Sequence, residues 1–400
     1  MKRYDALVIG AGPAGATAAL ALARAGFSVA VVEKAAFPRR KVCGEFISAA
    51  TWPLLRELGI AASLTASAGP PVRRVGLYAG EAIVEAPMPA PRESDAWGRA
   101  IGREVLDATL LEHASSTGAD VYQPCEVAGW EEQSGEYQVR ISNARTPAGT
   151  LRARVLVAAH GSWESGAMRT QPPRREHRPA DLLGFKAHFQ GASLPAGLMP
   201  LVLFPGGYGG MVHSDGGRVS FSCCIRRDAL RECRASHPGL TAGEAVITYV
   251  IESSRGVREA LAGARRDAPW LSAGPIRPGI RPLARGRIFS VGNAAGEAHP
   301  LVAEGISMAI QSAWLLGEHL VAAESLCDAA LGSAAAGYEE AWHDNFAARV
   351  RASSVFAAIT TRGLSAAASI AVLRRLPPIL TWGARWSGKA SSLRRAQPTA

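Results

Sequence analysis

The sequence predicts an α/β protein in which a doubly wound parallel sheet carries an antiparallel β-sheet lobe and a helical C-terminus. Three observations predict this fold. Residues 5–33 read as an apolar strand, a glycine turn, an alanine-rich helix and a second apolar strand, the pattern of a parallel βαβ unit. Residues 182–225 contain longer strands broken by glycine and proline, which favours an antiparallel sheet. Residues 287–296 add a strand and a second glycine turn, so the chain returns to the first sheet.

The first glycine turn has the spacing Gly10-x-Gly12-x-x-Gly15 and opens a helix over 16–25. Gly10 permits the tight turn, Gly12 lets the backbone approach a pyrophosphate, and Gly15 lets the helix pack closely on the strand. The free N–H groups of the helix start suit an anion. Glu33 ends the second strand, where an acid bonds a ribose hydroxyl in this Rossmann-like pattern. The segment therefore predicts a dinucleotide-binding site.

Apolar periodicity and turn residues predict the remaining elements. Helices are expected at 52–58, 101–114, 227–236 and 242–262, and strands at 72–78, 82–86, 126–142 (a hairpin), 153–159, 185–190, 201–204, 210–213, 219–225 and 287–291. We expect a dinucleotide-binding domain over 1–180 with an inserted small β region at 70–95, an antiparallel substrate domain over 181–285, a return segment over 286–330, and a helical basic region over 331–400.

Composition restricts the class of protein. The 400 residues are 48% hydrophobic and 20% charged, enough for a large core. Six cysteines lack CxxC or metal-ligand spacing, so we expect no disulfide framework, no metal site and a reducing cytoplasmic location. The net charge of +10 is concentrated after Asp344, where lysines and arginines follow but no acidic residue. No nucleic-acid-binding motif accompanies this charge, and we expect no nucleic-acid partner.

The basic C-terminal region is also rich in large apolar residues, namely Leu364, Ile370, Val372, Leu373, Leu376, Ile379, Leu380, Trp382 and Trp386. Its longest uncharged run, 363–373, is shorter than the ~20 residues of a membrane-spanning helix. Apolar helix faces with cationic flanks suit the surface of an anionic bilayer, at the inner face of the membrane. The alternative is a helix packed on the body of the protein, and both interpretations stay open.

Four segments together resemble a large family of FAD-dependent enzymes. They are the opening glycine turn, Phe37-Pro38-Arg39-x-Lys41-x-Cys43-Gly44, Arg103-x-x-Leu106-Asp107 and Gly292-Asn293-Ala294-Ala295-Gly296-(x)3-Pro300. The family includes p-hydroxybenzoate hydroxylase-type monooxygenases, geranylgeranyl reductases and flavin-dependent halogenases. The resemblance covers residues 4–330.

The resemblance implies FAD as the cofactor, reduced by NAD(P)H or by a partner reductase. Asn293 stands where the family carries an acid toward the ribityl chain, and the helix start at Gly305 would direct its N–H groups toward the flavin. His160 replaces the acid of another family element. The implied FAD-binding residues are Gly10, Gly12, Pro13, Ala14, Gly15, Glu33, Lys34, Arg39, Lys41, Cys43, Arg103, Val127, Gly292, Asn293, Pro300, Gly305 and Ile306.

Three residues are candidates for catalysis: Cys43, Tyr208 and His299. By resemblance to the reductases, Cys43 would face the flavin; Lys41 and Arg40 favour its thiolate and the neighbouring Glu45 opposes it. Tyr208 lies in a segment resembling the Pro-x-Gly-Tyr-x-Trp motif that lines the reductases' substrate cavity, with Gly210 in place of the tryptophan. His299 is a candidate acid or base beside Pro300. A buried cysteine, a packed tyrosine and an exposed loop histidine remain the alternatives.

The expected function is monooxygenation of a lipophilic aromatic, polyketide or isoprenoid compound through a flavin C4a-hydroperoxide. The alternative is reduction of a double bond, with hydride from the flavin and a proton from Cys43, Tyr208 or His299. A third alternative is a non-catalytic flavin electron carrier. Halogenation is disfavoured because the halogenase segment Trp-x-Trp-x-x-Pro is missing from the sequence.

Overall fold

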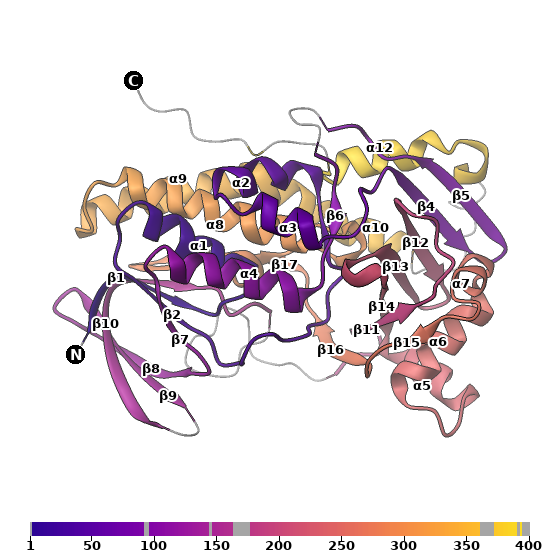
Figure 1. The fold of residues 1–400 in the computed structure, drawn as a ribbon, viewed down its shortest axis with the longest axis horizontal. Coiled ribbons are helices and arrows are strands. Elements are labelled where there is room, and N and C mark those ends of the chain that lie inside the picture. The colour runs from indigo at the N-terminus through magenta and orange to yellow at the C-terminus, as the bar shows by residue number, and fades with distance from the viewer. Residues whose placement is uncertain are drawn as a thin grey trace.

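The computed structural model describes residues 2–91, 96–143, 146–162, 177–360, 372–389 and 393. Two eight-stranded sheets lie toward opposite ends of the molecule, and long helices run between them (Figure 1). The predicted α/β fold with an antiparallel lobe and a helical C-terminus is confirmed.

The first sheet has a parallel centre made of the strands that the apolar runs predicted. Its order is β18 (Ala284–Arg285), β19 (Ile288–Ser290), β10 (Thr146–Ala158), β1 (Arg3–Ile9), β2 (Val29–Val32) and β7 (Asp120–Tyr122). Only β18 on this path runs antiparallel to its neighbour. The glycine turn and the second glycine turn follow β1 and β19, whose carboxyl ends point the same way on either side of β10. Both turns therefore meet at one edge of the sheet, where ligands bind in open α/β sheets.

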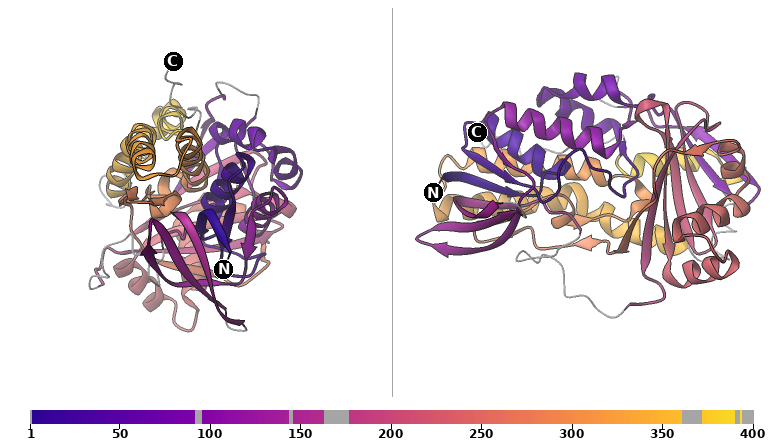
Figure 2. Two further views of the ribbon diagram at one scale, coloured as in Figure 1. Left: turned by 90° about the vertical axis from the view of Figure 1, so that its left-hand side faces the viewer. Right: turned by 60° about the horizontal axis from the view of Figure 1, so that its bottom comes forward.

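Helices cover one face of this sheet and a hairpin covers the other. The helical layer contains α1 (Pro13–Arg24), α4 (Arg103–Ser116) and α8 (Gly305–Ala322), with α9 (Asp328–Trp342) packed outside α8. The hairpin β8 (Glu126–Gln133) and β9 (Glu136–Asn143) turns at Ser134-Gly135, as predicted, and packs over an apolar cluster that includes Tyr4, Leu7 and Tyr137. The end view in Figure 2 shows the two layers.

The second sheet is mostly antiparallel. Its order is β15 (Arg265–Arg266), β11 (Leu182–Gln190), β14 (Val219–Arg226), β13 (Gly207–His213), β12 (Leu198–Phe204), β4 (Arg74–Ala79) and β5 (Ala82–Pro87), and β16 (Leu271–Ile276) also pairs with β11. Because β4 pairs in parallel with β12, the strands of the 70–95 region belong to this sheet rather than to a separate insertion. The domain boundaries themselves stay predictions.

Three helices cover the outer face of the second sheet: α5 (Arg227–Ser236), α6 (Ala242–Ser253) and α7 (Arg255–Ala260). The single helix expected over 242–262 is wrong, because Ser254 is extended and forms a bridge with Gly80. Gly256 then packs so closely on Tyr78 that a Cβ would lie 2.5 Å from the ring. The contact with the sheet thus bends a chain whose local pattern is continuously helical.

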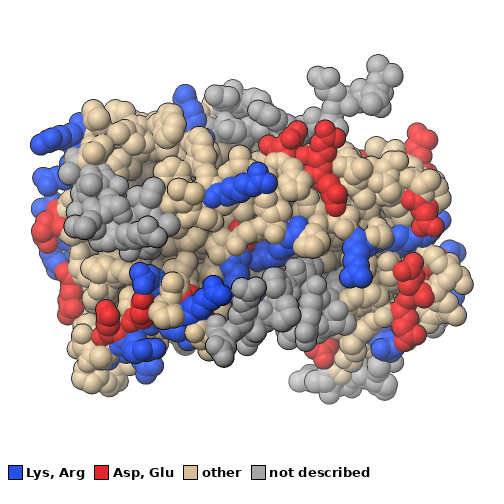
Figure 3. Space-filling model, turned by 180° about the vertical axis from the view of Figure 1, so that it is seen from behind, with Lys and Arg blue, Asp and Glu red and all other residues tan. Residues whose placement is uncertain are grey.

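The C-terminal region adds α10 (Ala348–Thr360) and α12 (Pro378–Trp386), and α12 lies across β4 and β5. Leu364 and Ile370 lie outside the described residues. No described helix is long and apolar enough to cross a membrane. On the face seen in Figure 3, described basic side chains lie interspersed with acidic ones rather than forming a continuous basic surface.

The remaining elements are short. They are α2 (Trp52–Glu57), α3 (Ala61–Ser67), the strand pairs β3 (Phe46–Ile47) with β6 (Arg99–Ala100) and β17 (Gly279–Ile280) with β20 (Gly296–Glu297), and single turns at Ala49–Thr51, Asp215–Gly217, Gly292–Ala294, Pro300–Val302 and His343–Ala347.

Candidate active site

The first glycine turn leaves no room for side chains at two of its glycines. A Cβ on Gly10, whose φ is +100°, would lie 2.6 Å from the carbonyl oxygen of Ala159, and one on Gly15 would lie 1.8 Å from that of Gly10. At Gly12 the nearest atoms are instead guanidinium nitrogens of Arg103 (3.5 Å) and Arg39 (4.0 Å). Gly12 therefore faces cations, not packed backbone, and the turn fits a diphosphate.

Three cations gather around this turn. Arg103 is buried and bonds both carboxylate oxygens of Asp107 at 2.7 Å. Lys41 lies in the same cluster, and burial together with the charges of Arg103 and Arg39 lowers its pKa to about 8. Clustered cations repel one another, so each disfavours the charged form of the others. A bound ligand with two negative charges would offset this repulsion. The donor set thus fits the FAD diphosphate.

Glu33 is held in place at the end of β2. Its carboxylate accepts hydrogen bonds from the backbone N–H groups of Ala11 (2.8 Å) and Ala35 (2.9 Å), and Arg39 lies 3.7 Å away. This fixes a buried acid beside the glycine turn, in the place expected for ribose binding. Lys34 is exposed next to it, and Val127 packs at the edge of the hairpin cluster. Their roles toward FAD stay predictions.

The second glycine turn lies against the first. Gly292 has a φ of +61°, and a Cβ there would lie 2.8 Å from that of Ala14, which follows Pro13 at the buried start of α1. The Asn293 amide donates to the Ser162 hydroxyl at 2.7 Å. The two turns are about 280 residues apart in the sequence, yet they lie against each other in the structure. This is the arrangement that a ligand as long as FAD requires.

The start of α8 follows this turn. Gly305 and Ile306 form its first turn, and no atom lies within 4 Å of a Cβ built on Gly305. The residue before the helix, Glu304, is buried and paired with Lys389 at 3.1 Å, with Arg349 at 3.9 Å. Two cations of the C-terminal region therefore neutralise the Glu304 carboxylate. The positive end of the α8 dipole thus stays available to a bound anion.

The structure brings two of the predicted catalytic residues together. The Tyr208 hydroxyl and Nδ1 of His299 form a buried hydrogen bond of 2.6 Å, although 91 positions separate them. Burial raises the pKa of Tyr208 well above its usual range and lowers the pKa of His299 to about 4. The thiol of Cys224, the cross-strand neighbour of Tyr208, also bonds the hydroxyl, and burial raises its pKa to about 12. At neutral pH all three groups are uncharged.

Cys43, the third candidate, lies elsewhere. Its thiol is half-buried, accepts a hydrogen bond from the N–H of Glu45 (3.4 Å) and contacts the Arg103 guanidinium. The cation in contact with Cys43 is thus Arg103 of α4. The sequence analysis named only the neighbouring Lys41 and Arg40, because Arg103 is distant in the sequence. Cys43 belongs to the cation cluster rather than to the pair formed by Tyr208 and His299.

The side chain of Glu45 points to the second sheet, and its expected effect on Cys43 stays a prediction. Glu45 has a φ of +65° and a fully buried carboxylate that pairs with Lys186 and with His188 (2.8 Å), and it also accepts from Ser214 (3.1 Å). These partners lower its pKa to about 2 against the effect of burial. The alternation of Lys186 and His188 with Phe185, Ala187 and Phe189 was the signal for this buried polar face.

An apolar surface extends from Tyr208 across the inner face of the second sheet. Its buried members are Leu77, Ala79, Val84, Leu203, Tyr208 and Cys224, and Leu182, Leu201, Ile276, Leu301, Leu373 and Leu380 pack against them. Leu301 follows Pro300 in the loop before α8, and Leu373 and Leu380 come from the C-terminal region. Three parts of the chain therefore enclose this surface, which we call the inner apolar face.

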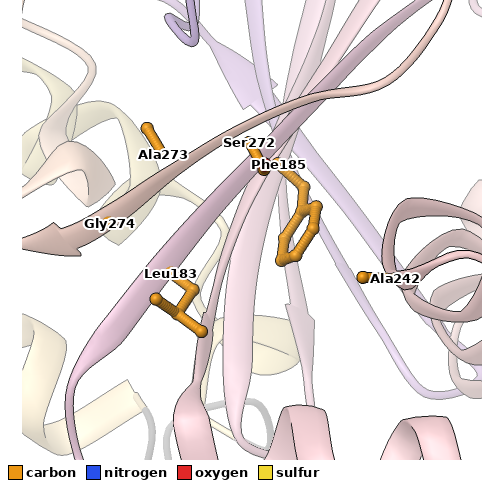
Figure 4. A pocket seen from close by; sticks show the side chains of 6 residues that line it. All are labelled: Leu183, Phe185, Ala242, Ser272, Ala273 and Gly274. Carbon is orange, nitrogen blue, oxygen red and sulfur yellow. The ribbon is translucent and has the colours of Figure 1, made fainter. Parts of the chain in front are cut away.

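A separate pocket of about 500 Å³ lies on the other side of the sheet. Leu183, Phe185, Ala242, Ser272, Ala273 and Gly274 line it, and the Phe185 side chain lies between β11 and α6 (Figure 4). Phe185 packs with the outer, helix-covered face, whereas Tyr208 lies on the inner face. This pocket therefore does not contain the candidate catalytic residues. No group of metal-ligating side chains occurs in the described part of the chain.

Fold and site together define a protein of the FAD-binding class. The FAD binding domain family matches residues 3–344, and the chain belongs to this family. The conditioned medium factor receptor 1 of Dictyostelium discoideum is 26% identical over 353 residues, or 80% of this chain. This chain spans 64% of that relative's length. Digeranylgeranylglycerophospholipid reductase 2 of Methanopyrus kandleri is 26% identical over 388 residues, covering 91% of this chain and 89% of the reductase.

Solved structures confirm the fold. The flavin-dependent brominase Bmp2 superposes with a TM-score of 0.78 at 17% identity, covering 98% of this chain and 95% of the brominase. PqsL of Pseudomonas aeruginosa, described as a probable FAD-dependent monooxygenase, superposes with a TM-score of 0.72 at 21% identity, covering 92% of this chain and 99% of PqsL. Monooxygenases, reductases and halogenases share this fold, so the fold alone does not define the reaction.

Proposed function

We propose that this FAD-dependent oxidoreductase saturates a conjugated carbon–carbon double bond in a lipophilic compound, and that Tyr208 supplies the proton. One observation carries the proposal: the hydroxyl of Tyr208 is buried and bonded to His299, and Tyr208 is itself a member of the inner apolar face. FAD held by the two glycine turns would supply the hydride, and NAD(P)H or a partner reductase would reduce it. The reductase of Methanopyrus kandleri, which aligns over 89% of its own length, supports this choice.

The acidities of the pair favour reduction over phenol hydroxylation. A histidine with a pKa of about 4 is a poor base at neutral pH, so this pair does not readily take a proton from a substrate hydroxyl. A tyrosine with a raised pKa keeps its proton until a strongly basic carbon forms beside it. In the tautomer with hydrogen on Nδ1, His299 donates to the tyrosine oxygen. The hydroxyl proton is then free for the substrate, and the phenolate left behind is stabilised.

The substrate class follows from the inner apolar face. Leucine, alanine and valine side chains from β4, β5 and β12 line it, and the polar groups that reach it are uncharged. Burial of apolar area contributes roughly 25 cal/mol per Å², so an isoprenoid, polyketide or aromatic compound is the kind of ligand this surface holds. The first turn of α8 would stabilise negative charge on the reduced ring.

Anaerobic turnover tests the reaction type. Reduced holoenzyme is incubated without oxygen with lipophilic compounds whose carbon–carbon double bond is conjugated to a carbonyl group, and products are analysed by mass spectrometry and by NMR for loss of the alkene carbons. We expect products heavier by two hydrogen atoms. Tyr208→Phe should keep its flavin and its rate of flavin reduction, but should turn over at least about 100-fold more slowly, the usual contribution of a general acid. Full activity of Tyr208→Phe would contradict the role of this hydroxyl.

Monooxygenation, which the sequence favoured, remains the second candidate because the inner apolar face excludes water, as oxygen chemistry on a flavin requires. Incubation under labelled oxygen distinguishes the two. A product that carries one labelled oxygen atom would replace the reductase proposal by a monooxygenase. If neither product forms while flavin cycles, an electron carrier is the better description.

A further inference from the structure

We propose that the outer surface of α10 and α12 docks on an anionic lipid bilayer. This surface, the C-terminal apolar face, consists of Val355 and Phe356 on α10, Val372 and Leu376 just before α12, and Ile379, Trp382 and Trp386 on α12. The proposal rests on exposure, helix orientation and charge, and it does not depend on the reaction that the enzyme catalyses.

Large apolar side chains are exposed almost only here. Among the described residues, nine large hydrophobic side chains are exposed, and all but Leu240 and Val321 belong to the C-terminal apolar face. Trp382 is 62% exposed, the largest value in this group. Scattered single apolar residues are normal on a protein surface, but a concentration of this kind indicates an interaction site.

Packing fixes the direction in which α12 faces. Leu380 packs against the inner apolar face, Ala384 is buried, and the Thr381 hydroxyl donates to the carbonyl oxygen of Pro87 at 2.7 Å. Ile379 and Trp382 are three residues apart and therefore share one side of the helix. This side faces away from the one formed by Leu380 and Ala384. The helix is thus apolar on both sides, although only one side is covered by this protein.

The end of α12 is anchored, so this orientation is built into the fold. Three residues later, Lys389 is buried, bonding the carbonyl oxygen of Val302 at 2.5 Å and the carboxylate of Glu304 at 3.1 Å. The ring of Trp386 meets that of Phe356 with centroids 5.5 Å apart. This contact joins α10 and α12 into one surface. In Figure 1, α12 lies at the periphery of the molecule.

The positive charges around the C-terminal apolar face favour an anionic bilayer over a protein as the binding partner. Arg351, Arg374, Arg375 and Arg385 are exposed, and no acidic residue follows Asp344 in the sequence. Tryptophans flanked by arginines suit the headgroup region, and each cation near an anionic surface adds electrostatic attraction. A symmetric dimer through the same surface would place arginines against arginines, which disfavours a second copy.

The surface also lies next to the inner apolar face. Leu380 of α12 contributes to the inner apolar face, whereas Ile379 and Trp382 are exposed. A bilayer bound to α12 would therefore lie one helix away from the substrate surface. A cytoplasmic enzyme docked at the inner face of the membrane could then take a substrate that is dissolved in lipid.

Vesicle co-sedimentation tests the docking. The full-length holoenzyme is mixed with phosphatidylcholine vesicles that contain no or one third phosphatidylglycerol, at low and high salt. We expect binding to the anionic vesicles, weakened by salt because screening reduces the electrostatic part. The double variant Trp382→Ser/Trp386→Ser should bind at least about tenfold more weakly, since apolar burial drives insertion. Leu240→Ser, an exposed apolar residue outside the C-terminal apolar face, should bind like wild type.

Flavin content and melting temperature equal to wild type establish that the double variant is folded. Sedimentation velocity without lipid tests the alternative occupant. The proposal is overturned if wild type does not bind anionic vesicles, if the double variant binds them equally well, or if wild type is a dimer that the double variant dissociates.

Discussion

Individual glycines determine where the cofactor is expected, and their roles differ. The motif spacing predicted close packing at Gly15, and the structure agrees. The predicted ligand approach at Gly12, where two guanidinium groups lie nearest, stays a prediction. A local motif could predict the packing because each glycine acts on neighbours within the same turn. The contact of Tyr208 with His299 could not be predicted in this way, since two sheets and a loop must first be assembled.

The difference between these glycines gives the first test. Gly12→Val should leave the fold intact, because a Cβ there meets only guanidinium ends at 3.5 Å and 4.0 Å, but it should prevent flavin loading. We expect a colourless protein whose circular dichroism spectrum matches the apoprotein.

Gly15→Ala is the contrasting variant. Its Cβ would meet the backbone oxygen of Gly10 at 1.8 Å, so it should lower stability as well as flavin content. Normal flavin affinity of Gly12→Val would contradict the placement of the diphosphate.

At the scale of the element, period and turn residues predicted the main strands of both sheets and helices α1, α2, α4 and α5, but not β7, β16 or α3. The strands of the second sheet begin and end within a few residues of the expected positions, because Gly206-Gly207 and Gly216-Gly217 interrupt clear apolar runs. The break at Ser254 was missed, since it depends on a bridge to Gly80 in another part of the chain. Which side of α12 packs on the protein was also left undecided by the sequence, because this depends on contacts with β4 and β5.

The loop before α8 gives a test of stability against pH. His299 has a pKa of about 4 in the folded protein and 6.5 as a free group, so the unfolded chain takes up its proton first as pH falls. Stability attributable to this histidine is therefore present above pH 6.5 and decreases as the pH falls toward 4.

Between pH 7 and pH 5 the loss should be about 2 kcal/mol, as the pKa difference implies. His299→Gln should remove this part of the pH dependence, which urea unfolding at several pH values measures. Parallel stability curves for variant and wild type would show that His299 does not stay neutral on folding.

At the scale of the whole molecule, buried charges join the two sheets. Glu45 follows the loop that carries Cys43, and its carboxylate crosses to Lys186 and His188 on β11. Lys389 joins the C-terminal region to Glu304 in the same manner. Such pairs add little net stability compared with apolar residues, but removal of one partner leaves an uncompensated charge. They therefore fix how the inner apolar face lies relative to the glycine turns.

Glu45→Gln tests this connection. The variant leaves the Lys186 ammonium buried without its counterion, and we expect a loss of about 3–5 kcal/mol in the free energy of unfolding at pH 7. The double variant Glu45→Gln/Lys186→Met should recover most of this loss, because the buried charge is removed as well. The folded pKa of Glu45 is about 2 and its free value 4.5, so the wild-type advantage exists above pH 4.5 and shrinks as pH falls toward 2. A single variant as stable as wild type at pH 7 would mean that other contacts hold the two sheets together.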